Sequence, residues 1–75
     1  MTMVDNTTDG VAQIGETAGV VWQVLAENGP LTATKIIREV DAPRDLTMQA
    51  LGWLAREDKI QIDESNRSRL YSLRS

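Results

Sequence analysis

The segment TATKIIREVDAPRDLTMQALGWLAR, residues 32–56, decides the fold of this chain. Its first apolar residues are Ala33, Ile36, Ile37 and Val40, which follow the i, i+3, i+4, i+7 spacing of one face of an α-helix. A second apolar pattern of helical period begins a few residues later. The segment therefore predicts two short helices joined by a tight turn.

Both of these helices carry end signals in the sequence. Thr32 can cap the first helix through its side-chain oxygen. Asp41-Ala42-Pro43 ends that helix, because the residue before a proline is pushed out of the helical region. Two starts stay open for the second helix: either Asp45 caps it, or Pro43 occupies its first turn.

The second helix divides into two faces when residues 45–58 are placed at about 100° per residue. The apolar face, expected to be buried, consists of Leu46, Ala50, Leu51, Trp53 and Leu54. The opposite face, expected to be exposed, consists of Asp45, Met48, Gln49, Gly52 and Arg56. The exposed face is the one that a partner could contact.

After this helix, the apolar residues change from a helical period to alternation. Ile60 and Ile62 are separated by one residue, and Tyr71 and Leu73 repeat that spacing. The polar segment Glu64–Ser68 lies between the two pairs. This pattern predicts a β-hairpin.

Another helix is expected before the deciding segment, from about Ile14 to Glu27. Its apolar residues lie on one face, and Asn28-Gly29 with Pro30 supplies a stop. Residues 1–12 are rich in Thr, Asp, Asn and Gly without any period. They predict a flexible tail in front of a domain of residues 13–75.

The composition excludes several classes of function. A chain of 75 residues with 41% hydrophobic content is long enough for one domain with a small core. It contains no cysteine and no histidine, which excludes disulfides, thiolate or imidazole metal sites and any Ser-His or Cys-His nucleophile. We therefore expect no enzyme activity, no cofactor and no metal.

The charges are unevenly distributed around a net charge of −3. Residues 1–30 carry four acids and no base, whereas residues 31–75 carry all eight Lys and Arg against seven acids. Only the second part could therefore face phosphate.

No apolar stretch approaches the roughly 20 residues of a membrane-spanning helix, and the N-terminus lacks the basic and apolar regions of a signal peptide. The sequence predicts a soluble, cytoplasmic protein without membrane contact.

The expected order is helix, short strand at Leu31, helix, tight turn, helix and hairpin. This is the order of a winged helix-turn-helix domain, an α+β fold that is mostly helical, with three helices, a short strand and a C-terminal β-hairpin wing. The second and third helices form the helix-turn-helix. The expected core is Ile14, Ala18, Val21, Trp22, Leu25, Leu31, Ile36, Ile37, Val40, Leu46, Ala50, Leu51, Leu54, Ile60, Ile62, Tyr71 and Leu73.

Two segments also resemble the paired signatures of a known family. IGETAGVVWQVL, Ile14–Leu25, and ALGWLAREDKI, Ala50–Ile60, are similar to those of a small winged helix-turn-helix domain family of bacteria and archaea, of unknown function. The resemblance covers about Ile14 to Leu73. It implies a compact domain that stands alone as a protein and forms dimers, and it marks no catalytic residue, ligand or operator.

The first functional hypothesis is DNA binding, in a regulatory role. Polar side chains of the third helix would read base edges in the major groove, and basic residues of the wing would contact phosphate. The candidate DNA-binding residues are Lys35, Arg44, Met48, Gln49, Arg56, Arg67 and Arg69.

The second hypothesis is a protein-interaction or dimerisation module without sequence-specific DNA binding. The small, flat patch of Met48, Gly52 and Ala55 suits the side chains of a partner protein. A homodimer is expected, because a small core gains from burying further apolar surface. Gly15 and Gly19 favour close approach between helices inside one chain, with contact to a second chain as the alternative.

Overall fold

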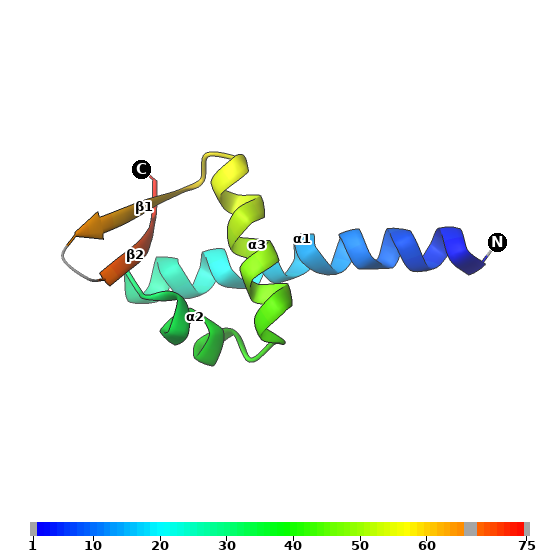
Figure 1. Ribbon diagram of the computed structural model, residues 1–75, viewed down its shortest axis with the longest axis horizontal. Coiled ribbons are helices and arrows are strands. Elements are labelled where there is room, and N and C mark those ends of the chain that lie inside the picture. The colour runs from blue at the N-terminus through cyan, green and yellow to red at the C-terminus, as the bar shows by residue number, and fades with distance from the viewer. Residues whose placement is uncertain (1, 66–67, 75) are drawn as a thin grey trace.

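The computed structural model describes residues 2–65 and 68–74 (Figure 1). Three helices precede a two-stranded antiparallel hairpin, which confirms the α+β, mostly helical winged helix-turn-helix prediction. The elements are α1 (Thr2–Asn28), α2 (Ala33–Val40), α3 (Arg44–Arg56), β1 (Ile60–Ser65) and β2 (Ser68–Leu73).

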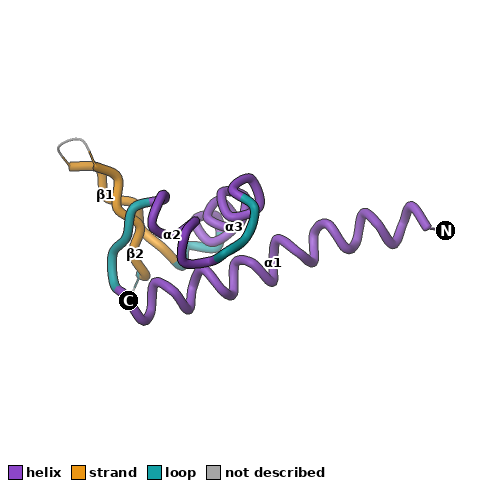
Figure 2. Tube along the Cα trace, turned by 90° about the horizontal axis from the view of Figure 1, so that it is seen from below, coloured by secondary structure: helices purple, strands orange, loops and turns teal. Residues whose placement is uncertain are grey.

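Helix α1 is longer than the sequence pattern predicts. The predicted start at Ile14 is wrong, because the helix begins at Thr2 and ends at Asn28. The segment predicted as a flexible tail, residues 1–12, is therefore helical from Thr2 onward. The sequence there has no proline, and a helix that is already formed extends at little cost. This N-terminal part projects past the other elements (Figures 1 and 2), which gives the molecule extents of 48 × 23 × 22 Å.

The projecting part, residues 2–13, is called the N-terminal arm below. Along the described side chains of α1, residues 10–13 are exposed and burial begins at Thr17. We expect deletion of residues 1–12 to change the free energy of unfolding of the single chain by less than about 1 kcal/mol, because the described side chains of this segment, residues 10–12, are exposed. Urea denaturation of dilute protein measures this. A larger loss at high dilution would mean that the arm contacts its own domain.

The end of α1 is fixed by backbone geometry and tied to the wing. Gly29 adopts a positive φ of 80°, and its N–H donates to the carbonyl of Leu25 at 2.8 Å. The short strand expected at Leu31 consists of one antiparallel bridge to Tyr71. In this bridge the Leu31 N–H donates at 3.0 Å and the Tyr71 N–H donates back at 2.8 Å.

The helix-turn-helix forms with the predicted end signals of its first helix. The side chain of Thr32 accepts a hydrogen bond from the Lys35 N–H at 3.3 Å and so caps α2. Asp41 ends α2 with a left-handed φ of 59°, and its N–H donates to the Ile37 carbonyl. Pro43 stands at the N-cap position just before α3, and no side chain caps this helix. Neither predicted start of α3 is therefore realised.

The core lies where α1, α2, α3 and β2 meet. Nine predicted core residues are buried: Ala18, Val21, Leu25, Ile36, Ala50, Leu51, Leu54, Ile60 and Tyr71. Six others are half-buried at its edge: Ile14, Leu31, Ile37, Val40, Leu46 and Leu73.

Three residues expected to be buried are instead exposed: Trp22 and Ile62 of the expected core, and Trp53 of the predicted apolar face of α3. Trp22, Trp53 and Ile62 are 45%, 39% and 46% exposed. The buried face of α3 is centred on Thr47, which is completely buried. Trp53 lies six residues later, away from the centre of this face, and its side chain is therefore partly exposed to solvent. The Thr47 hydroxyl donates to the Pro43 carbonyl at 3.1 Å, so its burial leaves no polar atom unpaired.

The position of Ile62 follows from the strand register. Ile62 pairs with Tyr71, two residues farther toward the wing tip than the pair of Ile60 with Leu73. Its partner Tyr71 is buried, because β2 packs against α1 and α2, whereas β1 contacts α3 alone among the helices and leads away from them toward the wing tip (Figure 2). Ile62 is therefore exposed although it shares a face with buried Ile60.

Candidate nucleic-acid interface

The predicted exposed face of α3 is exposed in the structure. All five residues of this face are exposed: Asp45, Met48, Gln49, Gly52 and Arg56. The opposite face is buried in the core and consists of Thr47, Ala50, Leu51 and Leu54. A Cβ atom added at Gly52 would meet no atom within 4 Å. The middle of α3 is therefore open to a partner that needs close contact with the helix surface.

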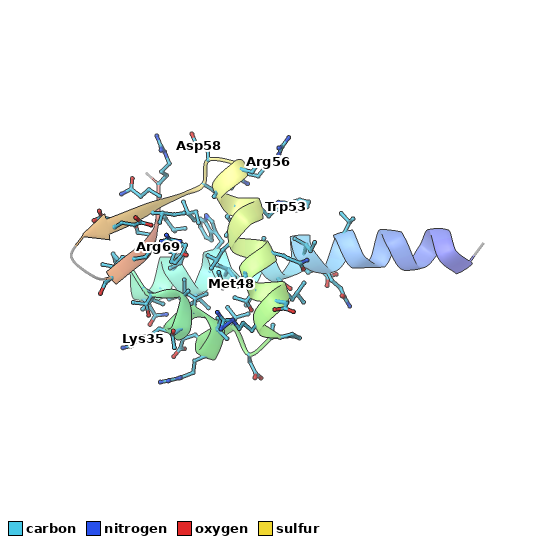
Figure 3. The ribbon with its side chains drawn as sticks, viewed as in Figure 1. Lys35, Met48, Trp53, Arg56, Asp58 and Arg69 are labelled. Carbon is cyan, nitrogen blue, oxygen red and sulfur yellow. The ribbon has the colours of Figure 1, made fainter. Side chains whose placement is uncertain are left out.

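The helix-turn-helix carries several exposed cations. Lys35 on α2 and Arg44 and Arg56 on α3 are exposed, and neither of the salt bridges formed within the described part of the chain uses them. Figure 3 shows Lys35 on α2 and Arg56 at the opposite end of α3, so these two do not converge. Arg38, which is absent from the predicted contacts, is also exposed and follows Lys35 by one helical turn.

The wing offers less free charge than predicted. Arg69 forms an exposed salt bridge with Glu64, its partner in the register of the hairpin. Interaction with the Tyr71 side chain and with the Glu64 carboxylate raises the pKa of Arg69 above its ordinary value. The Arg69 charge is thus balanced locally, whereas the predicted contact Arg67 lies outside the described residues.

The predicted protein-interaction patch is only partly exposed. Met48 and Gly52 face solvent, but Ala55 is half-buried against the core. Added Cβ atoms at Gly15 and Gly19 would also meet nothing within 4 Å. The prediction that these two glycines permit close helix packing inside one chain is therefore wrong, and contact with a second chain remains as the alternative.

The described residues contain neither a cluster of carboxylates suited to a metal ion nor a helix suited to a membrane. Among the side chains that the structure describes, no three Asp or Glu carboxylates come together in a way that could hold a metal ion. Within the same residues, no helix combines the length and apolar character that crossing a membrane requires.

Comparisons with known proteins agree with this architecture. Residues 7–73 match the model of the family described as Winged helix-turn-helix domain (DUF2582). The chain is 40% identical over 52 residues to Uncharacterized protein MJ1608 of Methanocaldococcus jannaschii, covering 67% of this chain and 74% of that protein. Its fold is similar to the solution NMR structure of protein BT2368 from Bacteroides thetaiotaomicron, with a TM-score of 0.76 and 32% identity over 83% of this chain and 76% of that one. The chain therefore belongs to the DUF2582 family of winged helix-turn-helix domains.

Proposed function

We propose that this domain is a DNA-binding transcriptional regulator that acts as a homodimer in the cytoplasm and has no catalytic activity. Winged helix-turn-helix domains commonly bind DNA by placing the second helix of the motif in the major groove. The observation that carries the proposal is the exposed helix-turn-helix surface, whose cations Lys35, Arg38 and Arg44 have no acidic partner within the described part of the chain.

The exposed residues divide by role. Lys35 and Arg44, near the two starts of α2 and α3, suit phosphate contacts that position the domain. Gln49 lies on the exposed face of α3 and suits a bidentate contact to an adenine edge. Met48 is one position away and suits the apolar methyl group of thymine.

The charge of the whole chain limits the expected affinity. A net charge of −3 opposes general attraction to DNA, and Arg69 is already paired with Glu64. We therefore expect weak binding that depends strongly on salt. The same two observations favour the second candidate function, a protein-interaction module that uses the exposed surface of Met48 and Gly52.

Titration with mixed genomic DNA fragments at about 50 and 200 mM salt tests the proposal. If Lys35, Arg38 and Arg44 each contact one phosphate, the slope of log affinity against log salt is about −2.7. Affinity should then fall roughly 40-fold between these two salt concentrations. Absence of binding at the lower salt, or an affinity that does not change with salt, would favour the protein-interaction module instead.

A further inference from the structure

The middle of α3 carries no positive charge. Between Arg44 and Arg56, the two ends of the helix, the sequence DLTMQALGWLA contains no Lys or Arg. Both arginines are exposed, and neither takes part in the salt bridges formed within the described part of the chain. Met48, Gln49 and Gly52 are exposed between them, and Figure 3 shows Met48 on the body of the helix and Arg56 at its end. A ligand that covers this face therefore meets uncharged residues at its centre and cations toward the ends.

This charge pattern complements the major groove of DNA. The groove is about 12 Å wide, with phosphates along both walls and base edges between them. Arg44, which begins α3, is one of the residues proposed above to contact phosphate. At a rise of about 1.5 Å per residue, Met48 and Gly52 follow about 6 and 12 Å along the helix axis. When Arg44 lies on a phosphate, Met48 and Gly52 therefore lie over base edges.

Gly52 is the point on this face where a ligand can come closest to the helix. It has no side chain, and a Cβ atom added there would meet no atom within 4 Å. Its neighbours three and four residues away on the helix are Met48, Gln49, Ala55 and Arg56. Met48 is 36% exposed and Ala55 packs at the edge of the core, so both present apolar surface beside the glycine. A small apolar group can thus reach the backbone of α3 at Gly52 and contact Met48 as well.

The major groove displays one such group, the methyl on C5 of a pyrimidine. Thymine carries it in every A·T pair, and the remaining recognition groups of the base edges are hydrogen-bond donors and acceptors. The same methyl group occurs on 5-methylcytosine. Met48 is flexible and polarizable, so it adapts its shape to a methyl group. Asp45, the exposed acid of this face, lies about 10 Å before Gly52 along the axis, so its carboxylate is two helical turns from the methyl.

We infer that α3 selects DNA through the C5-methyl group of a pyrimidine, which packs on Gly52 beside Met48 and Ala55. Gln49, one turn before Gly52, is then placed on a neighbouring base. The inference rests on the DNA binding proposed above and names the chemical group that the helix recognises. A protein partner on the same face is the alternative, and an absence of DNA binding would favour it.

Copies of one DNA pool that differ only in their methyl groups test this contact. Fragments enriched from mixed genomic DNA by repeated binding to the wild-type protein are amplified in three forms: with thymine, with uracil in place of thymine, and with 5-methylcytosine in place of cytosine. Uracil differs from thymine by the C5-methyl group alone. Because burial of one methyl group changes affinity by about fourfold, the thymine copy should bind about fourfold more tightly than the uracil copy. A gain from 5-methylcytosine without a loss from uracil would assign the methyl to methylated cytosine.

Two glycine variants make a matched pair for the site on the protein. Gly52→Ala adds a methyl group where the pyrimidine methyl is expected, whereas Gly10→Ala adds one on the exposed N-terminal arm, and both positions are open. Alanine favours a helix over glycine, so the thermal unfolding temperature should not fall in either variant. Gly52→Ala should bind the thymine and uracil copies within about twofold of each other, because its own methyl displaces that of thymine. Gly10→Ala should keep the wild-type preference.

Three results would overturn the contact. Equal affinity of the wild-type protein for all three copies removes the methyl contact but leaves DNA binding in place. An unchanged preference for thymine in Gly52→Ala means that the methyl lies elsewhere on the protein. Failure to enrich any fragment at about 50 mM salt overturns both this contact and the proposed DNA binding.

Discussion

Ile36→Ala is expected to unfold or nearly unfold the domain. Ile36 is the buried residue of α2, a helix of only eight residues that contacts α1, α3 and β2. Removing three carbons from such a site costs about 2–5 kcal/mol, because transfer energy is lost and a cavity remains. A chain of 75 residues has a free energy of unfolding of about 4–11 kcal/mol in total. Urea denaturation at 25 °C followed by circular dichroism measures the loss.

Ile62→Ala is the matched control for this prediction. It removes the same atoms from a side chain that is nearly half exposed near the wing. Its effect should stay below about 1 kcal/mol, because less apolar area is lost and no closed cavity forms. Equal losses for the two variants would show that the burial of Ile36 does not hold α2 in place.

The helix-turn-helix could be predicted from sequence because its signals are local. The spacing of apolar residues, Thr32 as a cap and the proline after Asp41 all act within one or two helical turns. The burial of Thr47 could not be predicted, since a face defined by apolar residues alone omits it. A threonine fits a core when its hydroxyl bonds a carbonyl four residues earlier, as Thr47 does with Pro43. That omission rotated the predicted face toward Trp53.

The interface was predictable in its position but not in its charge. The exposed face of α3 lies opposite its buried face. An error of about one residue in the predicted buried face therefore still leaves most of the exposed residues correctly assigned. The pairing of Arg69 with Glu64 depends on strand register, and the strands reach Ser65 and begin again at Ser68, inside the segment predicted to be a turn. The extension of α1 to Thr2 carries no periodic signal, so composition suggested a tail.

Reversing two cations of the helix-turn-helix should largely abolish DNA binding. Lys35→Glu combined with Arg44→Glu removes two proposed phosphate contacts and adds two charges that repel DNA. Hydrogen bonds to charged groups contribute about 1.5–3 kcal/mol each, so the affinity should fall by at least roughly 100-fold at low salt. The slope of log affinity against log salt should decrease by about two units. Both side chains are exposed, so thermal unfolding should change little.

The matched control reverses two cations at the other end of α3, Lys59→Glu with Arg74→Glu. Arg74 already pairs with Asp58 at 3.3 Å, and its N–H donates to the Lys59 carbonyl. Figure 3 shows Asp58 at the opposite end of the helix pair from Lys35. Both double variants lower the net charge by the same amount, so a general charge effect weakens them equally and contradicts the proposed interface. A large loss confined to Lys35 and Arg44 locates the phosphates at the helix-turn-helix.

Gln49→Ala should then relax the preference for one base without changing the salt slope, because an amide on the exposed face of α3 contacts a base edge and no phosphate.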